Sequence, residues 1–253
     1  MNIQKFQKYS REISPLYPAL ADKAEAISRA IENSPINVTA ISDGDGILVK
    51  HIIDSLCCAE AVARYADAAR GEGADGNSSG AERRLTLCDV GSGGGFPALP
   101  IAAALGDISV CALDSTAKKC RFIEESAASA GITNLTSVCA RAEEAKGLFG
   151  TFDFVTARAV ARLNMLCEFC IPLLRVGGEF LPMKGKSGAE ELTEAENAIA
   201  VLRAKTVEYV EYAIRDPAFD EDRQERFIAR IRKTDETEKI YPRSFAQIKK
   251  KPL

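Results

Sequence analysis

Long apolar runs and a secretion signal are both missing from this sequence. None of its apolar stretches reaches the roughly 18 residues that a membrane-spanning helix needs. The amino terminus, MNIQKFQKYSREISPLYPAL, lacks the apolar centre of a secretion signal. We therefore predict a cytoplasmic protein with no membrane association.

The cysteine and histidine content does not indicate a metal centre. Eight cysteines are present, mostly inside apolar runs such as LTLCDV, ISVCAL and LTSVCA, and we interpret them as small buried side chains. Cys167 and Cys170 form one C-x-x-C pair, but a zinc site needs a second ligand pair at motif spacing. The single histidine, His51, is far from this pair in the sequence. The sequence therefore predicts no metal site.

Positive charge is also in slight deficit. The 33 lysines and arginines are outnumbered by 36 acidic residues. The net charge of -3 argues against a surface covered with positive charge that would bind nucleic acid. The last segment, IYPRSFAQIKKKPL, is an exception, because Arg243 and Lys249 to Lys251 have no acid beside them. This tail is either a solvated end or a phosphate-binding segment, and charge alone does not separate the two.

The order of patterns along the chain predicts one large α/β domain behind a helical cap. Apolar residues recur at helical spacing in the first part, and GEGADGNSSGAERR then has the composition of a flexible loop. We therefore divide the chain into an N-terminal helical cap at 1–70, a flexible loop at 71–84, an α/β core at 85–238 and a basic C-terminal tail at 239–253.

The core has the alternation of a doubly wound α/β fold. Short apolar runs at 85–90, 108–113, 135–140 and 152–157 alternate with segments of helical periodicity. This pattern predicts a mostly parallel, Rossmann-like sheet with helices on both faces. GGEFLPMKG predicts a fifth strand. VEYVEYAI and ERFIARIRK leave little room for a helix between them, so we predict an antiparallel C-terminal strand pair.

A glycine-rich turn follows the first strand. Asp89 is followed by Gly91, Gly93 and Gly95, and glycines let a backbone turn sharply and approach a ligand closely. In open α/β sheets, ligands bind at this edge. A dinucleotide fingerprint fits only in a variant frame that ends at Ala98, and no P-loop Gly-Lys-Ser/Thr follows. The better fit is acid-x-Gly-x-Gly-x-Gly, which resembles the first motif of S-adenosylmethionine-dependent methyltransferases.

Two further segments follow strands at the same edge. Asp114 and Ser115 come at the end of the second strand, where an acid accepts hydrogen bonds from ribose hydroxyls in either cofactor class. Ala142 and Glu143 follow the third strand, where a carboxylate or backbone groups commonly contact the adenine edge in methyltransferases. Glu143 is alternatively a surface carboxylate at the start of a helix.

The chain resembles the small-subunit ribosomal RNA methyltransferase G family, also called the glucose-inhibited division protein B family. The similar motifs are NVTAISD, LVKHIIDSL, DVGSGGGFPALPIA, LDSTAKKCRFI, RAEE, FDFVTARAVARL, LPMKGK and YPRSFAQIKKKPL. They span roughly residues 35 to 253 in the family's order. One departure is that Ser244-Phe245-Ala246 stands where the family often has Arg-Pro-Gly after its YPR.

This resemblance implies an enzyme that methylates N7 of a guanine in 16S, small-subunit ribosomal RNA, with S-adenosyl-L-methionine as its cofactor. It places Gly91, Phe96, Ala142, Glu143 and Arg158 at the cofactor site, and makes 85–238 the cofactor-binding methyltransferase core. With the residues deduced above, the predicted cofactor-binding set is Asp89, Gly91, Gly93, Gly95, Phe96, Asp114, Ser115, Ala142, Glu143 and Arg158.

Methyl transfer to guanine N7 needs no general base, because this nitrogen carries an available lone pair. The enzyme mainly has to align N7, the methyl carbon and sulfur, so we assign no catalytic residue. We expect the target base to be splayed into a pocket, and cations of the recognised motifs to contact RNA phosphates. The candidate RNA-binding residues are Lys50, His51, Arg158, Arg162, Lys184, Arg243, Lys249 and Lys250.

The partner and the rival functions follow from the same motifs. We expect the RNA to be presented within the small ribosomal subunit or an assembly intermediate, and the enzyme to be a monomer.

The closest rival is a methyltransferase for another RNA position or another substrate, which the glycine motif alone does not exclude. A nicotinamide-dependent oxidoreductase would need a pyrophosphate loop and a proton donor that the sequence lacks in convincing form. A noncatalytic nucleotide-binding protein is the third alternative.

Overall fold

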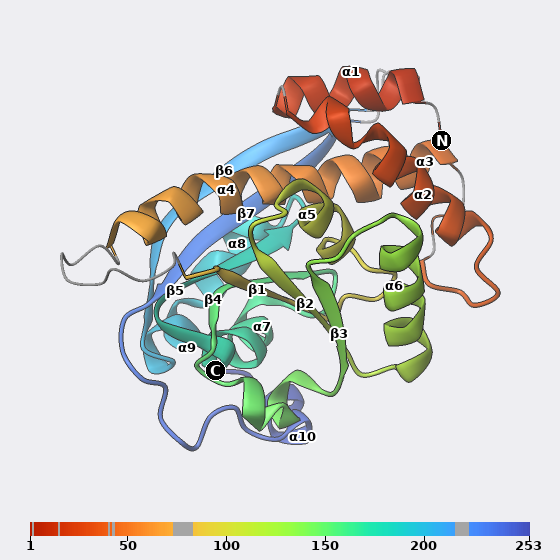
Figure 1. Ribbon diagram of the computed structural model, residues 1–253. Helices are drawn as coiled ribbons and strands as arrows, with labels where there is room; N and C mark the ends of the chain where they lie inside the picture. Colours follow the sequence, from red (N-terminus) through yellow and green to blue (C-terminus); the bar gives the residue numbers. More distant parts are fainter. Residues whose placement is uncertain (2, 15, 40, 42–43, 73–82, 216–222) are drawn as a thin grey trace.

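The structure is a computed structural model, and it describes all residues except 2, 15, 40, 42–43, 73–82 and 216–222 (Figure 1). Most of the predicted loop at 71–84 lies outside the described residues, as does part of the NVTAISD segment.

Within the described residues, seven strands form one sheet in the order β3-β2-β1-β4-β5-β7-β6. The strands are β1 Thr86–Val90, β2 Ser109–Asp114, β3 Leu135–Cys139, β4 Phe152–Arg158, β5 Leu174–Lys184, β6 Ala204–Arg215 and β7 Arg223–Lys233. Strands β1 to β5 pair in parallel, and β7 pairs antiparallel with both β5 and β6. The predicted parallel sheet and antiparallel C-terminal pair are therefore confirmed. The strand order reverses between β1 and β4, and ligands of such sheets bind at this switch point.

Helices surround the sheet. The α-helices are α1 Ile3–Ile13, α2 Ala21–Glu32, α3 Gly44–Gly46, α4 Asp54–Glu72, α5 Ala98–Ala104, α6 Ala117–Ser129, α7 Leu163–Cys170, α8 Gly188–Glu194, α9 Glu196–Val201 and α10 Phe245–Lys250. Short 3₁₀ helices occupy Tyr17–Leu20, Ala142–Glu144, Lys146–Leu148 and Ile171–Leu173. A π-helix at Ile47–Ile53 precedes α4 and carries two of the predicted RNA-binding residues. The π-helix is rare in proteins, and where it occurs it is often at a functional site.

The two faces of the sheet have separate apolar cores, because successive strand side chains point to opposite sides. Leu87 of β1 belongs to a hydrophobic cluster with residues of α4, α5 and α6. Its neighbour Cys88 belongs to a second cluster with residues of α7, α9 and α10. Helices on both faces make the fold doubly wound, as predicted.

The N-terminal cap shares its core with the sheet. Phe6 of α1, Ile27 of α2 and Leu56 of α4 are buried in the same cluster as Leu87 of β1. Figure 1 shows α1, α2 and α4 gathered on one side of the molecule and α10 near the opposite end. The cap is thus fixed on the sheet, and its residues have defined positions relative to the strands.

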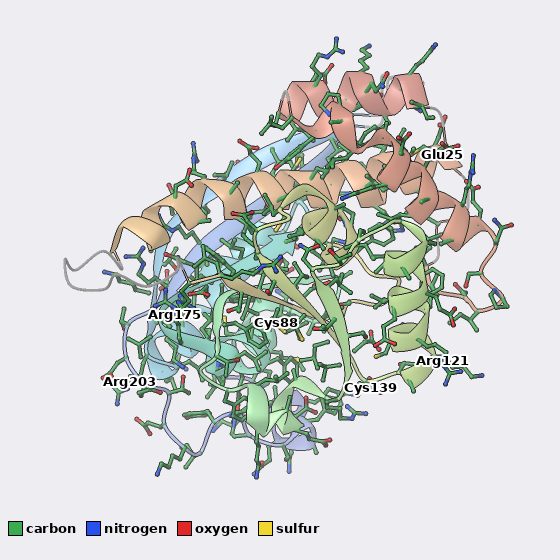
Figure 2. The ribbon with its side chains drawn as sticks, viewed as in Figure 1. Glu25, Cys88, Arg121, Cys139, Arg175 and Arg203 are labelled. Atoms are coloured by element: carbon green, nitrogen blue, oxygen red, sulfur yellow. The ribbon has the colours of Figure 1, made fainter. Side chains whose placement is uncertain are left out.

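Two of the eight cysteines differ from the expectation of burial, Cys139 clearly and Cys57 in part. Cys139 is exposed, whereas Cys88 is buried (Figure 2). Cys167 and Cys170 are also buried. Cys139 ends β3, an edge strand that is only partly covered, so the apolar run LTSVCA does not guarantee burial of its cysteine.

Among the described residues, no group of three or more His, Cys, Asp or Glu side chains is placed to hold a metal ion. Within the same residues, every helix is too short or too polar to span a bilayer.

Candidate functional site

The glycine-rich turn leaves the carboxyl end of β1 at the switch point. Gly91 has a φ of +75°, and a Cβ there would lie 2.5 Å from a methyl carbon of Val160. Gly95 has a φ of +88°, and its Cβ would lie 2.4 Å from a methyl carbon of Leu99. Both the backbone conformation and the packing therefore require glycine at these two positions.

Asp114 ties the turn to the end of β2. Its Oδ2 accepts a hydrogen bond from the Gly93 N–H at 2.9 Å, and its Oδ1 accepts one from the Thr116 N–H at 2.9 Å. The Gly91 N–H also donates to the carbonyl of Leu113 at 2.7 Å. A carboxylate oxygen accepts more than one hydrogen bond, so both Asp114 oxygens retain capacity for a ligand.

Asp89 lies beneath the turn and is completely buried. Its Oδ2 accepts a hydrogen bond from the Ala98 N–H at the start of α5, at 3.2 Å. Its Oδ1 has no hydrogen-bond partner, and burial raises the pKa of Asp89 to about 7. This carboxyl group holds the turn against α5, and it is not among the residues that line the adjoining hollow.

That hollow, the glycine-turn hollow, opens beside the ends of β1, β2 and β3. It is lined by Val90, Gly91, Leu113, Asp114, Ser115, Ala140, Arg141, Ala142, Glu143, Val160, Phe169 and Phe245. Five of the ten predicted cofactor residues meet there: Gly91, Asp114, Ser115, Ala142 and Glu143. Asp89, Gly93 and Gly95 support its turn from outside. Sequence reasoning missed Phe169 and Phe245, which approach from α7 and α10.

Glu143, which lines the hollow, has an unsatisfied acceptor. Its Oε1 is buried without a hydrogen-bond partner, and its nearest cation is the Arg141 guanidinium at 3.7 Å. A buried carboxylate oxygen without a donor is unfavourable, because it has lost water without a replacement. A ligand that supplies an N–H group there would remove this cost. The residues thus fit an adenine nucleoside, whose ribose has hydroxyl donors for Asp114 and whose base has an amino donor for Glu143.

A second hollow, the Arg158 hollow, lies on the other side of the end of β4. It is lined by Ile41, Lys50, His51, Asp54, Arg158, Ala159, Met183, Lys184, Gly185, Glu191, Gln224 and Arg226. Four of the predicted RNA-binding residues meet here: Lys50, His51, Arg158 and Lys184. Residues of the N-terminal cap and residues at the ends of β4 and β5 come together at this place.

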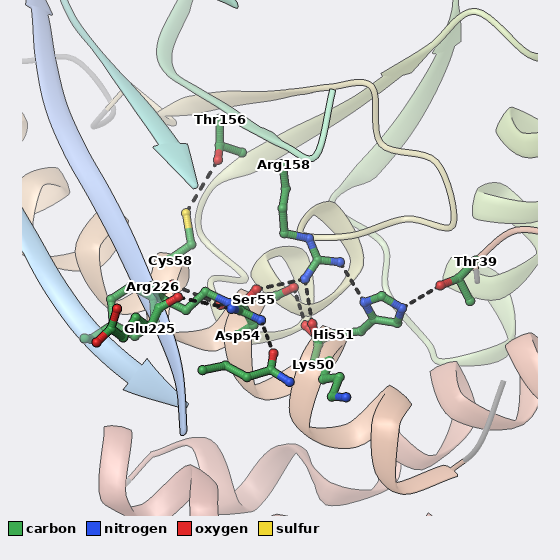
Figure 3. Close-up of polar contacts among 12 residues, drawn as sticks. Thr39, Lys50, His51, Asp54, Ser55, Cys58, Thr156, Arg158, Glu225 and Arg226 are labelled. Carbon is green, nitrogen blue, oxygen red and sulfur yellow. Dashed lines mark hydrogen bonds and ion pairs between the residues drawn. The ribbon is translucent and has the colours of Figure 1, made fainter. Parts of the chain in front are cut away.

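Arg158 connects the sheet to the cap. Its Nη1 donates to the Lys50 carbonyl at 2.9 Å and to Asp54 Oδ2 at 3.0 Å. Its Nη2 donates to His51 Nδ1 at 2.9 Å (Figure 3). The guanidinium carbon also lies 5.6 Å from the centre of the Phe96 ring. The structure therefore places Arg158 and Phe96 together under the cap, outside the lining of the glycine-turn hollow.

His51 is fixed as a neutral ring. Because arginine only donates, Nδ1 must accept, and the proton lies on Nε2, which donates to Thr39 Oγ1 at 2.6 Å. The ring stacks on Phe96 with centroids 4.7 Å apart. Burial, reinforced by the positive charge of Arg158, lowers the pKa of His51 to about 4. Both ring nitrogens are engaged, so His51 offers neither a cation nor a general base.

Asp54 and Arg226 are functional candidates that the sequence did not single out. Asp54 is 2% exposed, and its Oδ1 accepts a hydrogen bond from Tyr212 at 3.0 Å and faces Arg226 Nε at 3.4 Å. Asp54 thus bridges Arg158 of β4 and two residues of the C-terminal strand pair. The motif LVKHIIDSL contained Asp54, but its partners lie more than 100 residues away, as the separation of 104 from Arg158 shows.

Lys184 is neutralised within the Arg158 hollow. Its Nζ lies 2.7 Å from Glu191 Oε2 and donates to the Ala161 carbonyl at 2.5 Å. The other Glu191 oxygen lies 3.0 Å from the Ser187 hydroxyl, which donates to it. Lys184 therefore contributes shape and local hydrogen bonding more than net charge.

The remaining predicted RNA-binding residues lie elsewhere. Arg162 pairs with Glu194 at 2.5 Å on the surface. Arg243 pairs at 2.6 Å with Glu168, whose side chain is fully buried. Lys249 and Lys250 are exposed on α10, the helix whose first residue, Phe245, lines the glycine-turn hollow.

The end of β4 separates the two hollows. Arg158 and Ala159 line one, and Val160 lines the other. Ala159 has a φ of +56°, which is unfavourable for a residue with a Cβ. Such strain is retained where the surrounding structure requires it, and it is enriched at functional sites. Two groups bound in these hollows would approach each other across residues 158–160.

Comparison with known proteins adds a sequence relationship. Residues 28–218 match the family model of rRNA small subunit methyltransferase G. The Ribosomal RNA small subunit methyltransferase G of Lactobacillus johnsonii is 37% identical over 224 residues, covering 87% of this chain and 85% of that protein. The protein of the same name from Geobacillus thermodenitrificans is 36% identical over 259 aligned residues, covering 100% of both.

Among solved structures, a mutant 16S rRNA (adenine(1408)-N(1))-methyltransferase from Catenulisporales acidiphilia is similar with a TM-score of 0.49 and 17% identity. The match covers 63% of this chain and 87% of that chain.

Proposed function

Because this chain belongs to the rRNA small subunit methyltransferase G family, we propose that it transfers the methyl group of S-adenosylmethionine to N7 of a guanine in small-subunit ribosomal RNA. The observation that carries this proposal is the pair of hollows that share the end of β4 as a common wall. One hollow has the acceptors for an adenine nucleoside, and the other is large enough and polar enough for a splayed base.

The glycine-turn hollow supplies the cofactor site. Asp114 retains acceptor capacity for the ribose hydroxyls, and Glu143 offers its unpartnered Oε1 to the adenine amino group. When bound, S-adenosylmethionine supplies the electrophilic methyl group. The turn at Gly91 lets the backbone approach the ligand closely, because no Cβ stands between them.

The Arg158 hollow supplies the site for the target base. Guanine N7 has a lone pair, so alignment of N7 with the methyl group is sufficient and proton removal is unnecessary. This requirement agrees with the state of His51, whose two nitrogens are both used in hydrogen bonds. Arg158 and Asp54 act as positioning residues, because they fix the cap against the strand end that separates the two ligands.

Contacts with the RNA backbone come from cations around the two hollows. Lys50 lines the Arg158 hollow, and Lys249 and Lys250 are exposed beyond the glycine-turn hollow. Arg162, Lys184 and Arg243 have acidic partners, so their contribution to phosphate binding requires those pairs to be shared or broken. The net charge of -3 favours a substrate presented within the small ribosomal subunit or an assembly intermediate. We further propose that the enzyme acts in the cytosol as a monomer.

A methyl-transfer assay tests the proposal. Small subunits from cells that lack this gene are incubated with labelled S-adenosylmethionine, and the modified base is identified by nuclease mapping. We expect one N7-methylguanosine in the small-subunit RNA, lost with Arg158→Ala and retained with Arg29→Ala, whose side chain is 68% exposed on α2. If the RNA stays unlabelled while S-adenosylhomocysteine still binds, the proposed cofactor site stands and the proposed substrate is rejected. Binding of NAD instead would favour an oxidoreductase.

A further inference from the structure

The C-terminal tail returns to the cofactor side of the molecule. Phe245, the first residue of α10, lines the glycine-turn hollow together with residues that follow β2 and β3. Phe245 is 41% exposed, so part of its ring surface is open beside the hollow. This ring is therefore available to a ligand.

A buried ion pair fixes the tail in this position. Glu168 of α7 is completely buried, and its Oε1 accepts hydrogen bonds from the backbone N–H and Nε of Arg243, both at 2.8 Å. Arg243 Nη2 donates to Glu168 Oε2 at 2.6 Å. An unpaired carboxylate would be very unfavourable there, so the tail cannot detach without a large cost. Ile248 of α10, also fully buried, adds an apolar contact.

The start of α10 is equally well defined. Ser244 and Gln247 form a capping box. The Ser244 N–H donates to Gln247 Oε1 at 3.1 Å, and the Ser244 hydroxyl donates to the same oxygen at 2.8 Å. Such a cap stabilises the first turn of a helix and fixes the direction in which the chain enters it. Phe245 follows the cap directly, so its ring is held at the hollow by local as well as tertiary contacts.

The Phe245 ring already lies among planar groups. Phe169 lies nearly parallel to it, with ring centres 6.2 Å apart and an interplanar angle of 18°. The guanidinium carbon of Arg141 lies 5.3 Å from the centre of the Phe245 ring. Phe169 and Arg141 line the same hollow. A planar cation over the ring shows that the ring presents a face on which a flat group can stack.

We infer that Phe245 is an aromatic wall for the adenine ring of the bound cofactor. This inference rests on the proposed function and adds a binding residue from the tail to it. Asp114, at the end of β2, is suited to the ribose, so the base extends toward Glu143. Arg141 contacts both Glu143 and the Phe245 ring, which places Phe245 near that end of the hollow. Stacking of a base on an aromatic ring contributes about 1–3 kcal/mol, a five-fold or larger factor in affinity.

The test is the affinity of purified protein for S-adenosylhomocysteine and for adenosine, measured by calorimetry. We expect Phe245→Ala to weaken both ligands by about five-fold or more, because adenosine retains the base and lacks the amino-acid end. Phe245→Tyr keeps the aromatic face and should bind as the unaltered protein does. Ala246→Ser, at the exposed neighbouring position on α10, is the matched control and should change neither affinity.

Each alternative result has a distinct meaning. Equal affinities for Phe245→Ala and the unaltered protein would overturn the inference and leave the proposed function standing. Unchanged affinities with reduced methylation of small subunits would make Phe245 an RNA contact, which also overturns it. Failure of the unaltered protein to bind S-adenosylhomocysteine would instead reject the proposed function itself. Thermal unfolding of each variant, together with Phe245→Leu, which keeps apolar bulk without the ring, separates loss of stacking from loss of fold.

Discussion

The Arg158 guanidinium, at the end of β4, donates a hydrogen bond to the Asp54 carboxylate of α4 across 3.0 Å, and both side chains are largely buried. This contact joins the N-terminal cap to the strand end that lies between the two hollows. Arg226 and Tyr212 contact the same carboxylate, so a single acid organises residues from three parts of the chain.

Removal of this acid should destabilise the protein strongly. Asp54→Ala leaves Arg158 and Arg226 without their shared carboxylate, and loss of one partner of a buried pair costs about 3–5 kcal/mol. Urea denaturation measures the change in the free energy of unfolding. Glu124→Ala, at an exposed position on α6, should stay within about 0.5 kcal/mol of the unaltered protein. A loss at Asp54 no greater than at Glu124 would show that the network contributes little.

His51 should titrate far below an ordinary histidine. Its pKa is lowered to about 4 in the folded state, whereas the unfolded chain has about 6.5, so unfolded protein binds the proton first. The stability contribution of His51 is therefore present above pH 6.5 and is lost as the pH falls toward 4. Because His51 is the single histidine, its ring protons give one resolved NMR titration. A midpoint near 6.5 would contradict the buried, Arg158-bonded ring.

Asp89 should have the opposite dependence on pH. Burial raises its folded pKa to about 7, so its contribution to stability is present at low pH and is lost as the pH rises through 7. Asp89→Asn keeps an acceptor for the Ala98 N–H and removes the charge. The unfolding free energy of this variant, relative to the unaltered protein, should therefore increase between pH 5 and pH 8. A constant difference across that range would show that Asp89 remains ionised throughout.

Gly91 should tolerate no side chain. Gly91→Ala adds a contact of 2.5 Å with Val160 to the strain of a φ of +75°, so we expect a loss of more than about 2 kcal/mol and weak binding of S-adenosylhomocysteine. Gly131→Ala is the matched control, since Gly131 has a φ of +62° but open space at the Cβ position. It should lose about 1 kcal/mol and keep its affinity. Equal losses at both positions would remove the steric argument.

Local patterns were sufficient to predict the sheet and the meeting of five of the ten predicted residues in the glycine-turn hollow. Alternating strands and helices imply a parallel sheet, and the carboxyl ends of its strands meet at one edge, so Gly91, Asp114 and Glu143 were expected to converge. Burial was less predictable, because the run that contains Cys139 does not reveal that β3 is an edge strand. Edge or centre is decided by strand order, which depends on pairing between distant segments.

The sequence by itself determined the fold class, the glycine turn and the motifs that indicate the family, because each depends on residues close together in the chain. The tertiary structure alone decided which charges remain available. Lys184 and Arg243 look like free cations in sequence, yet each is matched to an acid, Glu191 and Glu168, that only folding brings near. It also decided the place of Phe245, which the tail, fixed by a buried ion pair, places at the glycine-turn hollow. Electrostatic and stacking interactions act over a few ångströms of space, and sequence separation does not encode that distance.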